Sequence, residues 1–444
     1  MILMVILFIV STAFAVDFKP KVSRLSSGGL ELSVNNLPQA KVFEVVYTST
    51  RGRHHGQFNQ EADGDWYHRN NEVPYNAKDK LAYTIIGEID GKTVVSKGTL
   101  QPEEYTGSAV TPPKRVRRGT VVFRDDFNGA AFDASNWDYE VSMYGGYNGE
   151  IQAYVQDHRN VFVKNGHLYV KPTFTADDDR FTEASIHSGV MDMKALYGYC
   201  TNADRNGCYR QGTNGCIPPV MSGKIKSKHT IKFGKVEVRA RIPRGDWLWP
   251  AIWMLPKSSE YGGWPASGEI DLMESRGNSF AGFDASNHGY NQVGATLHWG
   301  PSAGQNKFQW THGDLDGDWA YAMHTYRLEW TVDHIQVFVD DHLMMNVGIT
   351  QSFWNWGRFS GNNIWSSGTK AAPFDKAFYL ILNVAVGGTS GFFQDSWHYN
   401  SKKPWNNNSP TVACDFWDAR GLWMSSWHGN DVALEVDYVE MTQY

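Results

Sequence analysis

The sequence predicts an all-β protein made of two domains, a small immunoglobulin-like β-sandwich followed by a larger sandwich of two sheets. Short runs of alternating apolar and polar residues recur along the chain with Gly, Pro, Asn and Asp between them, and no long amphipathic helical pattern is evident. The chain has 444 residues, which exceeds the size of about 250–300 residues at which a single core usually stops growing. These observations favour two sandwiches in series.

The first fifteen residues form an apolar run that ends in Ala13-Phe14-Ala15. Such a run is typical of a secretory signal peptide cleaved after Ala15, and it is shorter than the ~20 apolar residues of a membrane span. No later stretch of the sequence approaches that length. We therefore expect residues 1–15 to be removed and the mature protein to be secreted, extracellular and not inserted in a membrane.

The small sandwich is predicted over residues 16–103, with strand-like runs at residues 30–34, 41–47, 80–86 and 92–95. The segment Asp65-Trp66-Tyr67 has two interpretations. An exposed indole would offer a platform for a sugar ring, whereas a buried Trp66 would fill the core of the small sandwich.

A linker is predicted over residues 104–119, because two prolines stiffen this stretch and a basic cluster follows them. The segment Arg115-Val-Arg-Arg118 has the Arg-x-x-Arg form that secretory-pathway convertases cut. A solvated basic linker and a cleavage site after Arg118 are both compatible with this pattern.

Composition narrows the class of ligand. The net charge of −6 argues against nucleic acid as a partner, whereas an aromatic content of 14% with 18 Trp exceeds what cores require. Carbohydrate sites use such side chains, because the apolar face of a sugar ring stacks on an aromatic ring.

The four cysteines are Cys200, Cys208, Cys216 and Cys414, and an even number in an exported protein indicates disulfides. The spacing of the first three does not match a zinc site. We expect one bridge within the loop at 200–216 and one from this loop to Cys414. The spacing leaves open which cysteine pairs with Cys414.

The larger sandwich is predicted over residues 120–444, with strand-like runs at residues 121–127, 149–155, 167–170, 235–242, 326–330, 335–339, 378–383 and 433–441. Within it, Glu269, Asp271 and Glu274 lie in one short stretch without a neutralising Lys or Arg among them. Alternation puts Glu269 and Asp271 on one face of a strand, and a β-bulge near Leu272-Met273 would return Glu274 to that face.

Carboxyl groups gathered on one face are typical of acid–base catalysis, since crowding pushes their pKa values apart. Two carboxyls about 5–5.5 Å apart in an aromatic setting are the arrangement of a retaining glycoside hydrolase. The stretch therefore indicates glycoside hydrolysis.

At this stretch the sequence resembles the β-1,3-glucanases (laminarinases) of glycoside hydrolase family 16, whose pattern is Glu-x-Asp-x-x-Glu. The motifs at residues 247–256, 296–300 and 382–388 resemble the same family. The resemblance implies a β-jelly roll with a concave glucan cleft. It implies that Glu269 is the nucleophile, that Glu274 is the general acid/base and that Asp271 assists Glu269.

The resemblance also implies that His298 lies next to the acid/base and hydrogen-bonds Glu274. It also implies a set of substrate-binding side chains. We add Arg276 to this set, because it lies two residues after Glu274 and so points to the same face of the strand. The predicted substrate-binding residues are Trp249, Trp253, Trp264, Arg276, Trp299 and Asn383.

No cofactor is expected to be required, but the resemblance implies a possible structural Ca²⁺ near Gly166 and Asp437. Residues 16–103 resemble carbohydrate-binding module family 39 in the order and spacing of their strands. The partner is expected to be β-1,3-glucan and the protein a monomer.

Two functions share this layout. The first is a secreted, retaining endo-β-1,3-glucanase that hydrolyses laminarin-type glucans by double displacement. The second is a non-catalytic recognition protein for β-1,3-glucan or lipopolysaccharide in innate immunity. Recognition proteins of this kind commonly lose the catalytic glutamates, so the retention of Glu269 and Glu274 favours the enzyme.

Overall fold

The computed structural model describes residues 119–283 and 286–444, together with nine strands in the N-terminal part whose bounds follow below. The chain divides into two compact units, residues 1–116 and 117–444. Residues 1–13 of the expected signal peptide and residues 101–118, which hold most of the expected linker and the possible cleavage site, lie outside the described residues.

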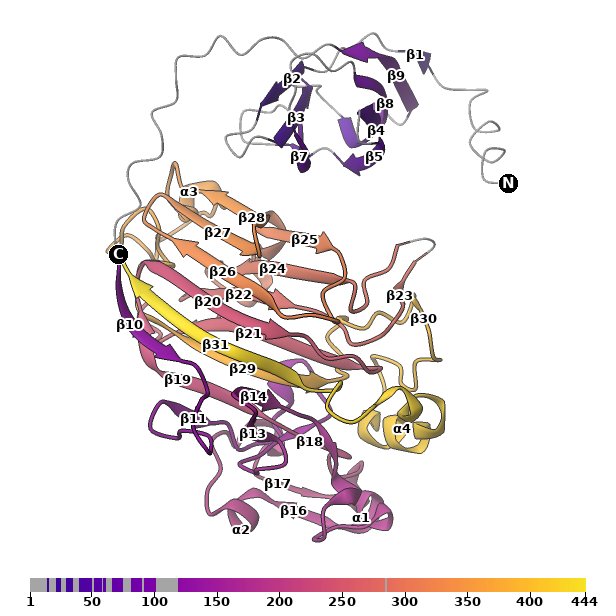
Figure 1. The fold of residues 1–444 in the computed structure, drawn as a ribbon, viewed down its shortest axis with the longest axis vertical. Helices are drawn as coiled ribbons and strands as arrows, with labels where there is room; N and C mark the ends of the chain where they lie inside the picture. The colour runs from indigo at the N-terminus through magenta and orange to yellow at the C-terminus, as the bar shows by residue number, and fades with distance from the viewer. Residues whose placement is uncertain are drawn as a thin grey trace. The chain divides into compact units, whose positions relative to one another are not determined.

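The first unit contains two separate sheets (Figure 1). Their strands pair antiparallel, except that the short edge strand β1 runs parallel to β9. One sheet has the strand order β1-β9-β8-β4-β5 and the other β2-β3-β7-β6. Their bounds are β1 Phe14–Ala15, β2 Lys21–Arg24, β3 Gly29–Val34, β4 Ala40–Ser49, β5 Gly52–Gln57, β6 Asn59–Gln60, β7 Trp66–Pro74, β8 Leu81–Ile89 and β9 Lys92–Leu100. Strand β1 consists of the last two residues of the segment that we expected to be cleaved.

The two sheets of the first unit pack against each other. Tyr47 of β4 and His68 of β7 come from different sheets, and their ring centroids lie 5.6 Å apart. Alternate residues are buried along β3, β7 and β8, such as Leu30 and Leu32 on β3. Trp66 is only 6% exposed, so the interpretation that it fills the core is confirmed.

The second unit is a sandwich of an eight-stranded and a seven-stranded sheet (Figure 1). The eight-stranded sheet has the order β13-β14-β31-β20-β26-β27-β28, with β10 paired to β31. Its bounds are β10 Thr120–Asp125, β13 Val161–Lys164, β14 His167–Val170, β20 Gly234–Arg241, β26 His324–Trp330, β27 His334–Val339, β28 His342–Gly348 and β31 Leu434–Gln443.

The seven-stranded sheet has the order β11-β19-β29-β21-β22-β24-β25, and all of its neighbouring strands are antiparallel. Its bounds are β11 Trp137–Tyr139, β19 Lys224–Ile231, β21 Leu248–Pro256, β22 Glu269–Glu274, β24 Gln292–His298, β25 His312–Asp316 and β29 Phe378–Val386. One large core of buried apolar side chains from both sheets holds the layers together.

Shorter elements complete the second unit. The small sheets contain β12 Ala153–Tyr154, β15 Thr173–Phe174, β18 Val220–Ser222, β16 Val190–Asp192, β17 Tyr209–Gln211, β23 Ala281–Gly282 and β30 His398–Tyr399. The α-helices are α1 Glu183–Ser188, α2 Met193–Tyr197, α3 Phe353–Trp356 and α4 Val412–Asp418. Among the described residues, none of the helices has the length and apolar character needed to span a membrane.

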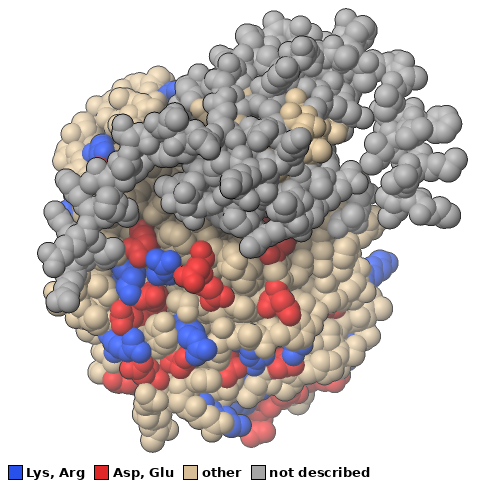
Figure 2. All heavy atoms as spheres, turned by 45° about the horizontal axis from the view of Figure 1, so that its top comes forward, with Lys and Arg blue, Asp and Glu red and all other residues tan. Residues whose placement is uncertain are grey.

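Charged side chains alternate with core residues along the eight-stranded sheet. On β20, Val236 and Val238 are buried, whereas the alternating residues Lys235 and Glu237 lie on the outer face and form an ion pair. In the view of Figure 2, acidic and basic side chains are interspersed on the described surface rather than gathered by sign.

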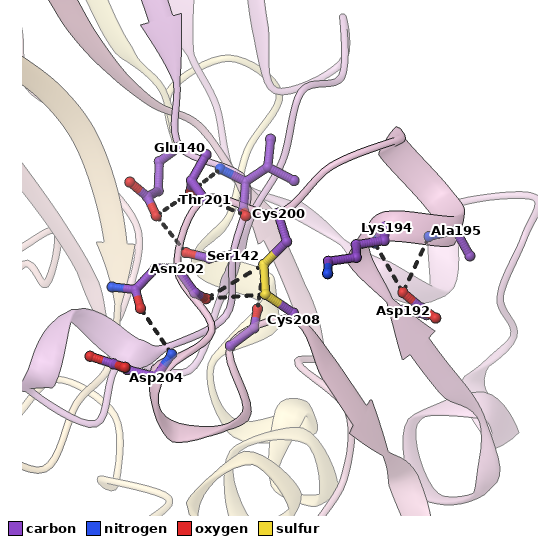
Figure 3. Close-up of a disulfide and its surroundings, with 12 residues drawn as sticks. Glu140, Ser142, Asp192, Lys194, Ala195, Cys200, Thr201, Asn202, Asp204 and Cys208 are labelled. Carbon is purple, nitrogen blue, oxygen red and sulfur yellow. Dashed lines mark hydrogen bonds between the residues drawn. A yellow bond between two sulfur atoms is a disulfide. The ribbon is translucent and has the colours of Figure 1, made fainter.

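Two disulfides fix the loops beside the seven-stranded sheet. Cys200 pairs with Cys208, and Cys216 pairs with Cys414 across a sequence separation of 198. The prediction of one bridge inside the loop and one to Cys414 is confirmed, and Cys216 is the cysteine that the spacing could not assign. Figure 3 shows the first bridge beside Thr201, whose hydroxyl donates to Glu140 at 2.5 Å.

Candidate active site

A β-bulge places the three acids of β22 on one face. Ile252 of β21 pairs with Met273, but the next residue, Trp253, pairs with Asp271, so Leu272 is the extra residue. Both Leu272 and Met273 are fully buried in the core. The bulge predicted near Leu272-Met273 is confirmed, and beyond it Glu274 returns to the face that carries Asp271.

Burial and mutual repulsion raise the pKa values of two of these acids. Burial and the neighbouring carboxyl of Asp271 raise the pKa of Glu269 to about 8. Burial and the charge of Glu274 raise the pKa of Asp271 well above its ordinary value. Within the described residues, the ion-pair contacts of Glu269 and Asp271 are to His298 and none is to Lys or Arg. The site therefore holds fewer negative charges at neutral pH than it has carboxyls.

His298, the β24 partner of Glu269 in the sheet register, faces two acids of the cluster. Its Nε2 lies 3.3 Å from Asp271 Oδ2 and 3.7 Å from Glu269 Oε1. We expected His298 to hydrogen-bond Glu274, and this was wrong. The bulge puts Glu274 opposite Gly294 instead, farther along β24.

Glu274 is held by an indole and lies at the edge of a pocket. Trp249 Nε1–H donates to Glu274 Oε1 at 2.9 Å. The pocket has a volume of about 210 Å³. It is lined by Glu274, Arg276, His288, Gln292, Gly294, His312, Asp314, Phe392 and Trp397.

Trp264 is the most exposed of the predicted sugar-binding residues, with half of its surface accessible. Its Nε1–H donates to Glu269 Oε2 at 3.1 Å, and its ring centroid lies 5.5 Å from that of His298. The structure therefore places an open indole beside the predicted nucleophile, where a sugar ring could stack on it.

Trp249 and Arg276 are engaged with protein groups. Trp249 is 8% exposed, and Phe392 covers its ring at a centroid distance of 3.8 Å. The Arg276 guanidinium donates to the carbonyls of Phe392 and His288 and lies over the rings of Phe392 and Trp397. Both residues position the surroundings of Glu274, and their predicted contacts with sugar stay predictions.

Asn383 is 5% exposed and both ends of its amide are occupied. Its Oδ1 accepts from Trp253 Nε1 at 2.6 Å, and its Nδ2 donates to the hydroxyl of Tyr154 at 3.1 Å. Asn383 therefore supports the partly buried Trp253, and its predicted contact with substrate stays a prediction. Trp253 itself lies beside Asp271 in the sheet register.

The prediction that Trp299 binds substrate was wrong. Trp299 is fully buried, and its Nε1–H donates to Thr311 Oγ1 at 2.9 Å. The physical reason is alternation along the chain, because His298 faces the acids and the residue after it points to the opposite side.

Two side chains at the site were not predicted. Lys224 is 4% exposed, and its ammonium lies 4.9 Å from the ring centroid of Trp253 and 3.3 Å from the hydroxyl of Tyr144. Asn306 lies 2.8 Å from His298 Nδ1. Neither residue belongs to a recognisable pattern, and only the sheet register and the loop path bring them to the site.

The residues expected near a calcium ion do not fit one. The Asp437 carboxylate is ion-paired with Arg239, and its other oxygen lies 3.9 Å from His167 Nε2. A guanidinium and an imidazole already surround the group that would have to ligate the cation. Gly166 adopts a left-handed turn with φ of 77°. We therefore derive no role for calcium.

Comparisons with known proteins agree with this geometry. The profile of Glycosyl hydrolases family 16 matches residues 192–371. A beta-1,3-glucan-binding protein of Penaeus monodon is 42% identical over 338 residues, which are 72% of this chain and 89% of that protein. A glucan endo-1,3-beta-glucosidase of Cryptopygus antarcticus is 32% identical over 271 residues, which are 60% of this chain and 80% of that protein.

Among solved structures, one from work on endo-acting O-glycanases of the human gut microbiota superposes with a TM-score of 0.50 at 24% identity. The superposed region covers 75% of this chain and 94% of the other chain. At this identity the similarity shows the fold alone. That fold is the β-jelly roll expected for the second unit.

Proposed function

The chain belongs to glycosyl hydrolase family 16, and on this basis we propose that it is a secreted, retaining endo-β-1,3-glucanase acting on laminarin-type glucans. The observation that carries the proposal is the intact cluster of Glu269, Asp271 and Glu274 on one face of β22. Buried carboxyls without a Lys or Arg partner are costly, and a chain that only bound glucan would have no need to keep them.

In the proposed reaction, Glu269 attacks the anomeric carbon while Glu274 gives its proton to the departing glycosidic oxygen. The covalent glycosyl-enzyme is then hydrolysed when Glu274 takes a proton from water and the resulting hydroxide displaces Glu269. Two inversions at one carbon give net retention. Asp271 lies next to Glu269, and its raised pKa keeps a second negative charge away from the nucleophile.

The donors around Glu269 support its role as the nucleophile. Trp264 Nε1–H donates to Glu269, and His298 lies close to the same carboxyl. Both contacts stabilise the anion that attack requires and oppose the burial that raises the pKa of Glu269. The reversed assignment, with Glu274 as nucleophile, is tested by the rescue experiment in the Discussion.

A recognition protein for β-1,3-glucan is the second candidate. The name of the Penaeus monodon relative, a beta-1,3-glucan-binding protein, favours it. The first unit is a separate β-sandwich, and we propose that it contributes glucan binding in either case. A monomeric, extracellular protein suits both candidates.

The test is incubation of the purified protein with laminarin. We expect short oligosaccharides on product sizing, and NMR of the fresh products should show the β-anomer before mutarotation. A Glu269→Ser variant should bind laminarin but release nothing. Binding of laminarin by the wild-type protein without any product would assign it to the recognition class.

A further inference from the structure

We infer that Asn306 is a positioning residue that fixes the proton of neutral His298 on Nε2. The imidazole then donates to the acid cluster, and the same proton keeps divalent cations out of it. The first half of this inference rests on the proposed function, whereas the second half concerns cation binding and does not.

The orientation of the Asn306 amide follows from its two neighbours. The backbone N–H of Trp299 lies 3.1 Å from Asn306 Oδ1, and Nδ2 lies 2.8 Å from His298 Nδ1. A backbone N–H can only donate, so the oxygen of the amide must face Trp299. The NH₂ group therefore faces His298, and Nδ1 accepts its hydrogen bond. In a neutral imidazole whose Nδ1 accepts, the proton is on Nε2.

The Nε2 proton points toward Asp271 Oδ2 and Glu269 Oε1. Asp271 is 4% exposed in its side chain, and its Oδ2 makes no hydrogen bond of ordinary geometry with the described residues. His298 Nε2 lies 3.3 Å from this atom and 3.7 Å from Glu269 Oε1. A donor at this position gives Asp271 Oδ2 a hydrogen-bond partner and stabilises a negative charge on Glu269.

The loop that carries Asn306 is anchored on both sides. The indole of Trp299 is fully buried and bonded to Thr311, and the Lys307 N–H donates to the Trp299 carbonyl at 2.8 Å. The ring of Phe308 stacks on His298 at a centroid distance of 5.3 Å. These contacts hold the amide and the imidazole in one relative orientation.

The same cluster has the spacing of a metal site. One ligand atom from each of Glu269, Asp271 and His298 lies within 4.8 Å of the others. Zinc with ligands at about 2.0–2.1 Å in a tetrahedron sets them about 3.3 Å apart, which is close to the contacts of His298 Nε2. A metal needs the lone pair of Nε2, however, and the Asn306 amide keeps a proton there.

The variant Asn306→Asp should reverse this arrangement. A carboxylate at this position still accepts from the Trp299 N–H, but toward His298 it must accept as well, so the neutral imidazole moves its proton to Nδ1. The Nε2 lone pair then faces Glu269 and Asp271 in a carboxylate–histidine–metal arrangement. We expect Zn²⁺ to bind Asn306→Asp about 10–100-fold more tightly than the wild-type protein.

The measurement is calorimetric titration of each purified protein with zinc chloride at pH 8, which requires no catalytic activity. Gln309→Asp is the matched control, since Gln309 is an exposed amide on the same loop and the charge change is identical. The double variant Asn306→Asp/His298→Ala should lose the gain. Equal zinc affinity in wild-type and Asn306→Asp proteins would overturn the inference.

A second measurement uses the unmodified protein. ¹⁵N NMR of the His298 ring at pH 8 should show the Nε2–H tautomer, and the Nδ1–H tautomer would also overturn the inference. In activity assays, Asn306→Asp should lower kcat on laminarin without zinc about tenfold, whereas Gln309→Asp should not. If the wild-type protein does not hydrolyse laminarin, the proposed function fails while the NMR and zinc results still decide the role of Asn306.

Discussion

Acidic side chains lie on the outer faces of both sheets of the second unit, but their surroundings differ. On the eight-stranded sheet, Glu440 contacts Arg124 at 2.7 Å and Lys235 at 3.3 Å. Burial raises the pKa of Glu440, but the hydrogen bonds from these two cations lower it by a larger amount. The net shift of this pKa is therefore downward. On the seven-stranded sheet, Glu269 and Asp271 are shifted upward. The neighbours, rather than the residue type, therefore distinguish a structural acid from a candidate catalytic one.

The largest effect should come from removing the proposed nucleophile. Glu269→Ser should lower turnover of laminarin by about 10⁴-fold or more while the protein stays folded, since one member of a catalytic unit is lost. Azide or fluoride should restore turnover of substrates with activated leaving groups, because the small anion occupies the vacated space. Glu440→Gln is the control from the other sheet and should keep its activity. Rescue of the Glu274 variant in place of the Glu269 variant would exchange the two roles.

The proposed acid/base should show a dependence on the leaving group. Glu274→Ala should slow hydrolysis of laminarin by about 10²–10⁴-fold, because the departing oxygen needs a proton. Aryl glycosides with good leaving groups need little acid assistance and should lose much less in the bond-breaking step. Steady-state and pre-steady-state rates on both substrate types provide the measurement. An equal loss on both types would contradict the assignment of Glu274.

A smaller loss is expected when only the support of Glu274 is removed. Trp249→Phe keeps the stack on Phe392 but deletes the N–H that donates to Glu274. A hydrogen bond to a charged group contributes about 1.5–3 kcal/mol, so kcat should fall about 10–100-fold. Trp427→Phe removes an indole donor to the backbone carbonyl of Asp246 and is the matched control. Comparable losses of kcat in both variants would show that the effect is one of folding.

The smallest effects concern stability, and they should have opposite signs on the two sheets. The pKa of Glu269 rises from 4.5 to about 8 in the native state, so its contribution to the free energy of unfolding is present below pH 4.5 and is lost as the pH rises to 8. Glu269→Gln, which cannot ionise, should therefore stabilise the protein at pH 8 by about 1–2 kcal/mol and have little effect at pH 4.

The pKa of Glu440 is lowered, so its contribution is present above its ordinary value of 4.5 and is lost as the pH falls through the lowered pKa. Glu440→Gln should destabilise the protein at pH 8 by about 0.5–1 kcal/mol, a small amount because Arg124 is largely solvated. Thermal denaturation of Glu269→Gln and Glu440→Gln at pH 4 and pH 8 tests both predictions. Shifts of the same sign at pH 8 would remove the distinction between the two sheets.

Much of the fold could be predicted because it depends on local patterns. Alternating residues and turn residues indicated two all-β units, and the odd spacing of Glu274 from Glu269 required a bulge that the register shows at Leu272. Alternation could also have assigned Trp299 to the core, because it directly follows His298.

The partners of the site residues could not be predicted in this way. Parity tells which face a side chain joins, but not which neighbour from another strand or loop reaches it. Trp253 meets Asn383 through a strand that lies more than a hundred residues away in the sequence, and His298 meets Asn306 through the path of one loop. Contacts of this kind depend on the assembled sheet, so the sequence did not reveal that Trp249 and Asn383 support other side chains of the site.

The disulfide between Cys216 and Cys414 has a consequence for proteolysis. The four candidate catalytic residues lie between these cysteines in the sequence, within the 198-residue span that the bridge closes. A single cut in an exposed loop of this span leaves both pieces covalently joined and the sandwich still packed around its core. Such a nicked molecule would migrate as one band without reductant and as two with it, and it would keep its candidate catalytic residues on one particle.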